Sequence, residues 1–344
     1  MNFYKKILNK ETILIAEIAQ AHDGSLGSAL SHIDAAADAG ADVVKFQTHI
    51  ANEESTHDEK FRIKFSHQDK TRFDYWKRME FTPSQWAILK KRAKKKKILF
   101  MSTIHSEKAF NLVNKLDVPA WKVASGEIFS KDLIDKMIKT KKPIIVSTGI
   151  ATMEEIRKIV KYLKNKKARF VVLQCTSSYP TELKKVGINI MTDIREKFKC
   201  HTGLSDHTGT IFPSLLAAAN NASVIEVHVA FDKKMFGPDV SSSVTFEELK
   251  FIKDTINNFD YLKKNKINKN RVSNELKRFK SLFTKSFALK ENKKKGHKIK
   301  RADLVLKKPG TGIKENQIKK LIGKTINKNL SSNRLIKLSD LNQN

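Results

Sequence analysis

Between residues 143 and 175 the sequence reads PIIVSTGIATMEEIRKIVKYLKNKKARFVVLQC, with two short apolar runs on either side of a helix-like segment. The runs at 143–147 and 170–175 are rich in β-branched residues, as buried strands are. The segment between them begins at Thr152 and places Glu155 three residues later, which is the spacing of a capping box at a helix start. This order predicts two parallel strands joined by a right-handed crossover.

The same alternation repeats along most of the chain. The expected strands are 13–18, 42–46, 98–102, 120–124, 143–147, 170–175, 201–205 and 223–229, separated by helix-like segments such as 26–39, 83–97, 106–116, 130–140, 152–164, 213–220 and 245–258. Eight such units in about 250 residues predict an α/β fold of the (β/α)8 TIM barrel type. An open doubly wound sheet is the competitor, but the run AHDGS after the first strand is not the glycine-rich turn typical of that fold.

The length of 344 residues suggests two domains. We expect the barrel to occupy residues 1–259. Residues 260–281 are rich in Lys and Asn and poor in periodic apolar residues, so we expect a linker there. Residues 282–344 carry short apolar runs and turn signals such as Pro309-Gly310, which predict a small domain of strand-poor or mixed β structure.

The composition is strongly basic. The chain has 67 Lys and Arg against 36 Asp and Glu, a net charge of +31, and residues 261–344 hold 25 of the basic residues and 5 of the acidic ones. A polyanion- or nucleic-acid-binding protein that uses this last quarter is therefore one hypothesis. Because the basic residues are mostly Lys with few interleaved aromatic residues, we expect a solvated surface that attracts small anions rather than a nucleic-acid partner.

Other function classes are excluded by simple counts. No stretch approaches 18 uncharged apolar residues, so we expect no membrane helix. The apolar run near the N-terminus is interrupted by Glu17 and lacks the cleavage site of a secretory signal. The two cysteines, Cys175 and Cys200, form no metal-binding or disulfide pattern, and we expect a cytoplasmic protein.

Polar residues lie at the end of nearly every expected strand. In chain order they are Glu17, Lys45, Gln47, Ser102, Thr103, Lys122, Ser125, Ser147, Thr148, residues 176–179, Ser205, Asp206, His207, Glu226 and His228. Because the C-terminal ends of barrel strands form the active-site face, we expect these groups to converge. Two lysines and a row of hydroxyls suit a small substrate that carries a phosphate and a carboxylate.

The residue pattern alone leaves some roles open. His207 and His228 end successive strands, where they could be structural or could hold a divalent metal with positions left for water and substrate. Ser125 and Ser147 could likewise cap helices or bind a ligand. Glu226 lies two residues before His228 and therefore faces the same side of its strand.

Several segments, in order, resemble the sialic acid synthase family. They are IAEIAQAHDGS at 15–25, GADVVKFQTH at 40–49, WKVASGEI at 121–128, STGIATMEEI at 147–156, CTSSYP at 175–180, GLSDHT at 203–208, EVHVAFDKKMFGPD at 226–239 and KKPGTGI at 307–313. The resemblance covers about residues 12–340. It implies a transferase that condenses phosphoenolpyruvate with an N-acetylated sugar to give a nine-carbon 2-keto acid. It also implies a C-terminal antifreeze-like (SAF) domain after the barrel.

The resemblance further implies residue roles. Glu17 would handle a proton, either on the attacking water or at the aldehyde oxygen. Phosphoenolpyruvate would contact Lys45, Thr103, Lys122, Ser125, Ser147, Ser177 and Ser205. The sugar would contact Gln47, Tyr179, Asp239 and Lys285. His207 and His228 would bind Mn2+ or Mg2+, and a homodimer would let the SAF domain of one chain reach the barrel of the other.

Departures from the family pattern concentrate at the sugar end. Lys285 stands where the family usually has Arg, and Lys lacks the planar fork that binds an N-acetyl group in the same way. Ser177 stands at a position that can be Asn. We therefore leave the sugar open between N-acetylmannosamine and a 2,4-diacetamido sugar. A related barrel that condenses phosphoenolpyruvate with a phosphorylated sugar is the alternative within the same class.

Overall fold

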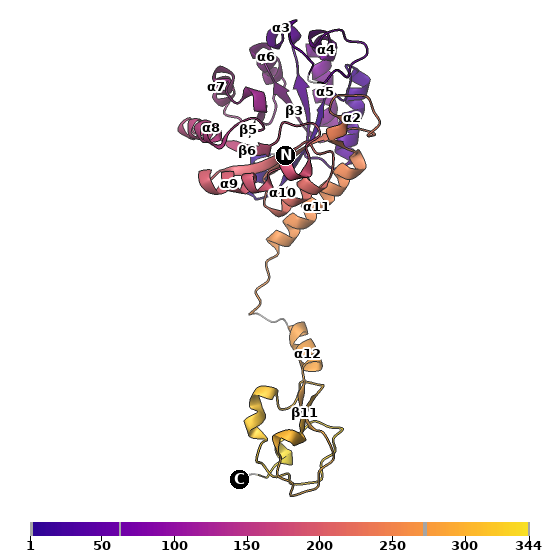
Figure 1. Cartoon of the computed structure of the whole chain (residues 1–344), viewed down its shortest axis with the longest axis vertical. Helices are drawn as coiled ribbons and strands as arrows, with labels where there is room; N and C mark the ends of the chain where they lie inside the picture. The colour runs from indigo at the N-terminus through magenta and orange to yellow at the C-terminus, as the bar shows by residue number, and fades with distance from the viewer. Residues whose placement is uncertain (1–2, 62, 271–273, 343–344) are drawn as a thin grey trace. The chain divides into compact units, whose positions relative to one another are not determined.

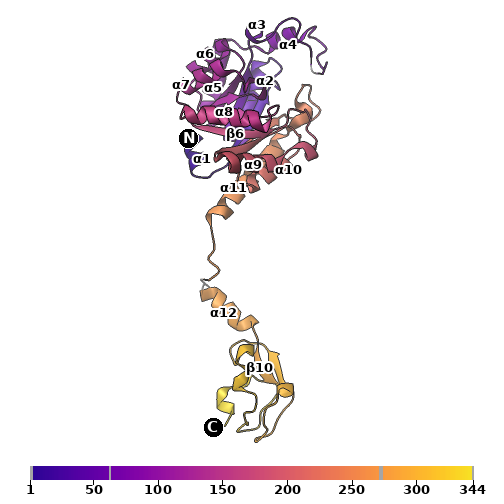
Figure 2. The ribbon, with the colours of Figure 1, turned by 60° about the vertical axis from the view of Figure 1, so that its left-hand side comes forward.

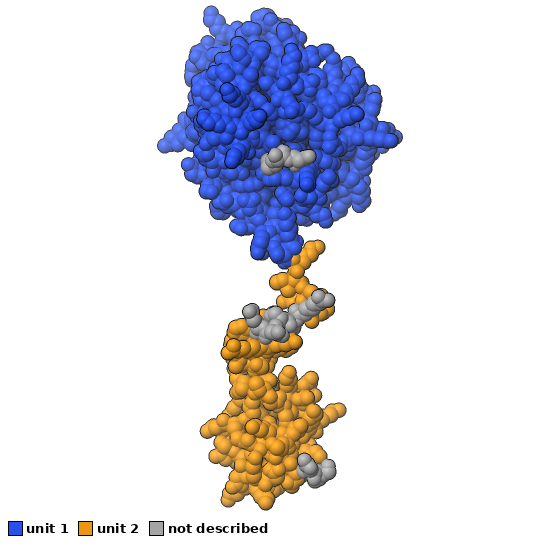
Figure 3. Space-filling view, turned by 180° about the vertical axis from the view of Figure 1, so that it is seen from behind, with its two compact units in different colours: residues 1–265 blue, residues 266–344 orange. Residues whose placement is uncertain are grey.

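A computed structural model describes residues 3–61, 63–270 and 274–342 (Figure 1). The chain divides into two compact units, residues 1–265 and 266–344, which Figure 3 colours blue and orange. Each unit has a hydrophobic core of its own.

The first unit is a closed barrel of parallel strands. Its strands are β1 (Ile13–Ala19), β2 (Val43–Thr48), β3 (Leu99–Ile104), β4 (Trp121–Val123), β5 (Ile144–Ser147), β6 (Phe170–Cys175), β7 (His201–Asp206) and β8 (Val224–Val229). Each strand pairs with the next, and β1 also pairs with β8, which closes the sheet. The (β/α)8 prediction is therefore confirmed, and all eight expected runs are strands. A two-residue strand, β9 (Ser243–Val244), pairs with β8.

Helices surround the strands (Figures 1 and 2). In the first unit they are α1 (Phe3–Leu8), α2 (Leu26–Asp38), α3 (Ala51–Glu54), α4 (Arg72–Met79), α5 (Pro83–Lys95), α6 (Glu107–Lys115), α7 (Lys131–Lys139), α8 (Met153–Asn165), α9 (Ile188–Phe198), α10 (Phe212–Ala219) and α11 (Phe246–Lys264). The expected capping box at Thr152 is present, and Thr245 with Glu248 forms another at the start of α11. In the part of the chain that the structure describes, no helix has the length and apolarity needed to cross a membrane.

Helix α9 was not expected from the sequence, for a physical reason. Its N-cap is Gly187, which has a left-handed backbone (φ 72°) and no side chain to cap the helix. The usual signal of Ser, Thr, Asp or Asn before an apolar run is therefore missing. The short helices α1, α3 and α4 were also not expected.

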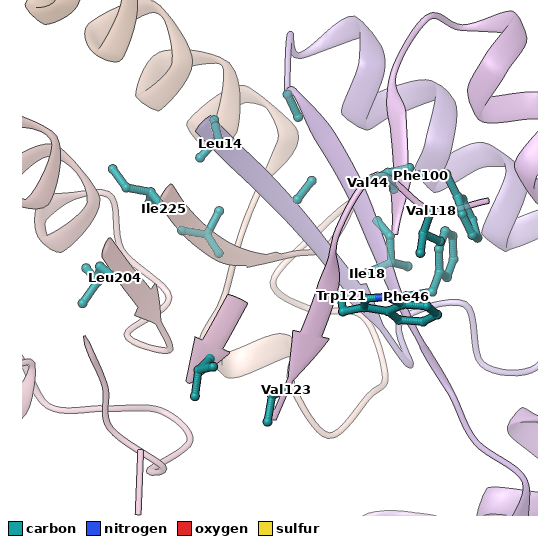
Figure 4. Close-up of a cluster of buried hydrophobic side chains, with 14 of the residues drawn as sticks. Leu14, Ile18, Val44, Phe46, Phe100, Val118, Trp121, Val123, Leu204 and Ile225 are labelled. Carbon is teal, nitrogen blue, oxygen red and sulfur yellow. The ribbon is translucent and has the colours of Figure 1, made fainter. Parts of the chain in front are cut away.

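Apolar packing holds the barrel together in two layers. Between strands and helices lies the larger cluster, part of which Figure 4 shows with Phe46, Phe100 and Trp121. Inside the barrel, at the N-terminal ends of the strands, Phe3 and Ile7 of α1 pack onto inward-facing apolar residues such as Ile13 and Ile15. Full burial of each such side chain contributes about 1.5–3 kcal/mol. The N-terminal half of the barrel interior is thus filled with apolar side chains.

The second unit contains α12 (Asn274–Phe283) and an antiparallel pair, β10 (Ser286–Leu289) and β11 (Leu304–Lys307). Its core is built from Phe287, Leu289, Leu304 and other residues through Leu341. The segment expected as a linker, 260–281, is helical at both ends, because α11 continues to Lys264 and α12 begins at Asn274. Apolar residues at helical spacing, Leu276, Phe279 and Phe283, were the signal that the Lys- and Asn-rich composition obscured.

Candidate active site

The site is formed by side chains that face the barrel interior at every second residue of each strand. Along β1, the side chains of Ile13 and Ile15 belong to the apolar filling inside the barrel, and Glu17 follows with the same period of two. Glu17 is the register partner of Lys45 on β2 and of His228 on β8. The inward-facing series therefore changes from apolar to charged on passing from the N-terminal to the C-terminal end of the barrel.

A pocket of about 290 Å3 lies at this C-terminal end. It is lined by all the residues to which the family resemblance gives a role except Asp239 and Lys285: Glu17, Lys45, Gln47, Thr103, Lys122, Ser125, Ser147, Ser177, Tyr179, Ser205, His207 and His228. Five other strand-end groups expected to converge here do not line the pocket, because their side chains bond to nearby groups instead: Ser102, Thr148, Thr176, Ser178 and Asp206. Glu226, Cys175 and His105 line it as well. The structure thus brings side chains from all eight strands or the loops that follow them into one cavity.

Four buried charges form the floor of this pocket. Nζ of Lys45 lies 2.5 Å from Glu17 Oε2 and 3.6 Å from Glu226 Oε2, and Nζ of Lys122 lies 3.2 Å from Glu226 Oε1. All four side chains are 5% exposed or less. Because desolvating isolated charges costs several kcal/mol per ion, this alternation of two cations and two anions is what makes their burial possible.

Hydroxyl groups add hydrogen bonds to three of these four charged side chains. Lys45 Nζ donates to Thr103 Oγ1 at 2.8 Å, and Lys122 Nζ donates to Ser147 Oγ at 2.7 Å. Ser205 Oγ donates to Glu226 Oε1 at 3.0 Å. The ammonium groups are therefore held in fixed positions at the pocket floor.

The carboxyl groups of Glu17 and Glu226 differ in pKa. Burial raises the pKa of Glu17 to about 7, although Lys45 acts in the opposite direction. Burial acts upward on Glu226 too, but Lys122 and Lys45 outweigh it and lower its pKa to about 2. Two carboxyl groups with pKa values separated in this way are suited to different tasks. Glu226 is a permanent anion, whereas Glu17 can exchange a proton near neutral pH.

A glycine shapes the neighbouring wall of the pocket. The backbone N–H of Gly149 donates to Ser125 Oγ at 2.9 Å. A Cβ added at Gly149 would lie 2.3 Å from Ser177 Oγ and 2.8 Å from Ser125 Oγ. A larger residue here would displace both hydroxyls, so the close approach of these three residues requires glycine.

The two histidines at the pocket have the chemistry of a metal-binding pair. The ring centroids of His207 and His228 lie 5.2 Å apart. His207 Nδ1 lies 3.0 Å from the carbonyl oxygen of Thr176, so Nδ1 carries the proton and Nε2 carries the lone pair. Burial lowers the pKa of His207 to about 3, which keeps the ring neutral, as metal ligation requires.

Few protein side chains are available to bind such an ion. Among the described residues, no group of three or more His, Cys, Asp or Glu side chains is placed to hold a metal. Two imidazoles fit a divalent ion only if water and substrate supply the remaining ligands. That arrangement is typical of a metal that acts on the substrate rather than one that stabilises the fold.

A second pocket of about 370 Å3 adjoins the first and shares Gln47, Tyr179 and His228 with it. Asp239, a predicted sugar contact, lines this second pocket. The remaining predicted contact, Lys285, belongs to the second unit and immediately precedes β10.

Sequence reasoning missed the outer wall of this second pocket. The wall consists of Phe61, Ile63, Phe65, Tyr75 and Trp76, together with Arg72 and Gln20. Its apolar members come from the long connection between β2 and α5, outside the strand ends on which the sequence analysis concentrated. The aromatic enrichment of that connection was the available signal, since binding pockets favour aromatic residues.

A closed β/α barrel with buried lysines, carboxyl groups and paired histidines at the C-terminal ends of its strands defines a (β/α)8-barrel enzyme. Comparisons with known proteins give the family. Residues 32–268 match the model of the NeuB family. The chain is 35% identical to N,N'-diacetyllegionaminic acid synthase of Campylobacter jejuni, covering 95% of this chain and 99% of that protein. It is 31% identical to pseudaminic acid synthase of the same species, over 96% of this chain and 97% of that protein.

A solved structure agrees with these relatives. The crystal structure of N-acetylneuraminic acid (sialic acid) synthetase from Leptospira borgpetersenii, in complex with citrate, superposes with a TM-score of 0.68 and 29% identity. The alignment covers 78% of this chain and 90% of that one. The chain belongs to the sialic acid synthase (NeuB) family.

Proposed function

We propose that this enzyme condenses phosphoenolpyruvate with an open-chain, unphosphorylated acetamido hexose, releasing phosphate and forming a nine-carbon 2-keto acid. The proposal depends above all on the buried floor of the first pocket, where Lys45 and Lys122 lie beside Glu17 and the histidine pair. The named synthases that resemble the chain support the same reaction class.

Phosphoenolpyruvate fits the first pocket by charge and size. Its phosphate and carboxylate need two cationic anchors, and Lys45 and Lys122 are held in place by Thr103 and Ser147. The hydroxyls of Ser125 and Ser177 lie together beside Gly149 and can donate to the anionic oxygens. Glu226 pairs with both lysines and fixes their spacing, so the donor enters a preorganised site.

The reaction joins carbon 3 of phosphoenolpyruvate to the aldehyde carbon of the sugar. Water then adds to carbon 2, and the bond between carbon 2 and the phosphate oxygen breaks. The two protons of the attacking water are both transferred: one reaches the former aldehyde oxygen, and the other leaves the new hydroxyl on carbon 2 as the ketone forms and is taken up by the departing phosphate. A divalent ion such as Mn2+, held by His207 and His228, would supply Lewis-acid polarisation of the aldehyde.

Glu17 is the group that moves a proton in this proposal. Its raised pKa of about 7 lets the carboxylate accept a proton from water near neutral pH. Lys45 contacts one of its oxygens and Gln47 Nε2 donates to the other at 2.9 Å, so the carboxylate is held in one orientation. We assign Glu17 as the base that activates the attacking water.

The second pocket is suited to the acceptor sugar. Tyr179 and Gln47 line both pockets and would lie where donor and acceptor meet, and Asp239 offers an acceptor for sugar hydroxyls. The apolar wall of Phe61, Ile63 and Phe65 suits methyl groups rather than a bare polyol.

We favour a sugar with two acetamido groups. The synthase of 35% identity is named for an N,N'-diacetyl product. Phosphoenolpyruvate contains no nitrogen, so both acetamido groups of such a product must come from the sugar. Two acetamido methyl groups match the apolar wall better than the single one of N-acetylmannosamine.

The charges of the second pocket disfavour a phosphorylated sugar. Arg72 is the one Lys or Arg among its described lining residues, and it is paired with Glu59 at 2.8 Å. The Asp239 carboxylate lies in the same pocket and would repel a phosphate. This pattern separates the proposal from barrels that condense phosphoenolpyruvate with phosphorylated sugars.

For the second unit we propose an SAF domain that acts as a lid on the barrel of a partner chain, with Lys285 as its sugar contact. The support is the family resemblance of its sequence and the presence of a separate core. Residues 1–265 produced alone would then keep donor binding but lose most sugar turnover. Unchanged turnover would remove the lid role.

A substrate panel tests the reaction. Purified enzyme with Mn2+ and phosphoenolpyruvate is given a 2,4-diacetamido hexose, N-acetylmannosamine, or N-acetylmannosamine 6-phosphate. We expect the fastest phosphate release with the diacetamido sugar and a product whose mass equals sugar plus pyruvate. Fastest turnover of the phosphorylated sugar would contradict the proposal, and tight salt-sensitive binding of nucleic acid without phosphate release would favour a polyanion-binding protein.

A further inference from the structure

A hydrogen-bonded chain leads away from Glu17 to a buried histidine outside the phosphoenolpyruvate pocket. Glu17 Oε1 accepts from Gln47 Nε2 at 2.9 Å, and Gln47 Oε1 accepts from Gln20 Nε2 at 2.8 Å. Gln20 Nε2 also lies 2.8 Å from Nε2 of His49. On the far side of the ring, His49 Nδ1 lies 2.5 Å from Glu54 Oε1.

With Glu54 ionised, one arrangement of protons satisfies the shortest of these contacts, although Nε2 of His49 also lies 3.3 Å from Gln47 Oε1. Glu54 can only accept when it is ionised, so His49 Nδ1 carries a proton and Nε2 carries the lone pair. That lone pair accepts from the amide of Gln20, whose second N–H then points to Gln47 Oε1. A flipped Gln20 would place its oxygen against an acceptor on both sides.

This arrangement of protons determines which group of Gln47 faces the carboxylate of Glu17. Because Gln47 receives a donor at its oxygen, its own NH2 group must face Glu17. A hydrogen-bond donor stabilises the ionised form of a carboxylate, whereas an amide oxygen in the same place would repel it. The direction of the hydrogen bonds between His49 and Gln47 therefore determines whether Glu17 faces the amide nitrogen or the amide oxygen of Gln47.

The His49 ring is itself fixed by stacking. Trp76 stacks on one side with centroids 3.9 Å apart and planes at 19°, and the His105 ring lies 4.8 Å away at 8°. Trp76 lines the second pocket and His105 lines the first. His49 is only 7% exposed, and burial lowers its pKa, which keeps the ring neutral.

We propose that His49 is a positioning residue, which orients the amide that donates to Glu17. It touches neither substrate in the reaction proposed above and acts through Gln20 and Gln47. The kinetic part of this inference rests on the proposed function, whereas the tautomer of His49 does not.

Two substitutions separate hydrogen bonding from stacking. His49→Phe keeps a ring between Trp76 and His105 but removes both ring nitrogens. His49→Gln loses the ring but can offer its amide oxygen to Gln20. We expect kcat to fall about 10- to 100-fold in His49→Phe, by analogy with the loss of a partner that orients a metal ligand. The KM for phosphoenolpyruvate should stay within about twofold, because the lysine anchors are untouched.

The expected rescue and the control make the test specific. His49→Gln should recover at least about tenfold of the lost kcat. His32→Phe is the matched control, since His32 is also a buried histidine packed against aromatic rings, Phe231 and Phe246, but lines neither pocket. It should leave kcat unchanged. If His49→Phe does not fold, Glu54→Ala, which frees Nδ1, should show a smaller loss of the same kind.

Three results would overturn the proposal: a kcat in His49→Phe close to that of the wild type, no recovery in His49→Gln, or an equal loss in His32→Phe. Nitrogen-15 NMR of histidine side chains in the full chain, assigned with His49→Phe, gives an answer that does not depend on activity. The Nδ1-protonated tautomer is expected, and the Nε2-protonated one would contradict the inferred direction. If no sugar supports turnover, the proposed function fails while the tautomer result still stands.

Discussion

The two ends of the barrel interior share one geometry but differ in chemistry. At the N-terminal end, inward-facing residues such as Ile13, Ile15 and Val43 are fully buried among apolar neighbours. At the C-terminal end, the next inward positions on the same strands are Glu17 and Lys45, equally buried but charged.

This difference shows that the N-terminal end of the barrel interior contributes stability, whereas the C-terminal end contains the candidate active site. The apolar end gains free energy from burial, in proportion to the area removed from water. The charged end gains little or none, because desolvation of each ion offsets the attraction between partners. Substitutions at the apolar end should therefore lower stability without changing activity, whereas those at the charged end should lower activity and, by leaving a buried charge unpaired, stability as well. The predictions below run from the largest expected effect to the smallest.

Glu17→Ala should produce the largest loss of activity. Removing a positioned acid–base group lowers kcat by about 10²–10⁴-fold. Thermal unfolding should remain cooperative, because the apolar layers are intact. Phosphate release under saturating substrates measures the effect, and activity within about threefold of the wild type would remove Glu17 from the mechanism.

Removal of divalent ions should be nearly as damaging. With two imidazole ligands from the described site, the ion would be weakly held and a chelator such as EDTA should strip it. Activity should return with Mn2+, and His207→Ala should raise the Mn2+ concentration needed. Full turnover in the presence of chelator would refute the metal role of His207 and His228.

Lys122→Met tests the donor anchors. The ammonium group makes a 2.7 Å hydrogen bond to Ser147 and a 3.2 Å ion pair with Glu226. Loss of a charged hydrogen bond to substrate costs about 1.5–3 kcal/mol, so affinity for phosphoenolpyruvate should fall about 10- to 100-fold. Calorimetric titration measures this, with the surface variant Lys158→Met as a control that should bind normally. An unchanged affinity would show that the phosphate and carboxylate sit elsewhere.

The pH dependence of the reaction rate should follow the ionisation of the Glu17 carboxyl group. Its pKa is raised to about 7, so the ionised fraction grows as pH rises through this value. A base must be ionised to act, and we therefore expect kcat/KM, which reports the free enzyme, to rise through about pH 7 and to level off at higher pH. The inflection should be absent from the residual activity of Glu17→Gln. A rate that instead falls through pH 7 would assign Glu17 as an acid.

Ile15→Val, one inward position below Glu17, should have the smallest effect on activity. Shortening a buried isoleucine by one methylene costs about 0.5–1.5 kcal/mol of stability. We expect lower resistance to urea and an unchanged kcat. A large loss of kcat would mean that the apolar end is coupled to the site, and the separation drawn above would fail.

Much of the site could be foreseen because barrel geometry is regular. Lys45, Lys122, His207 and His228 lie at strand ends in the sequence, and parallel strands in a barrel bring such ends to one face. The expected roles of these residues remain predictions. The wall at Phe61 and Phe65 could not be foreseen in this way, because it lies in a long connection whose path depends on tertiary contacts.

The chain of contacts through His49 was also beyond reach of the sequence. Gln20, Gln47 and His49 are polar residues near two strand ends, and nothing in their spacing specifies which amide faces which. The direction of these hydrogen bonds depends on three contacts, each shorter than 3 Å, that join Gln47 to Gln20, Gln20 to His49, and His49 to Glu54. Such contacts are set only after the barrel has closed.

Local order along the chain was enough to establish the alternation of strands and helices, the closure into eight units and the family. The alternation and the eight units follow from hydrophobic periodicity and capping, which act over a few residues, and the family follows from the resemblance of particular segments such as those at 40–49 and 226–239. The tertiary structure alone decided that Glu17 and Glu226 share Lys45 and yet differ in pKa. Charge energies depend on distance and burial in three dimensions, and a linear sequence contains neither.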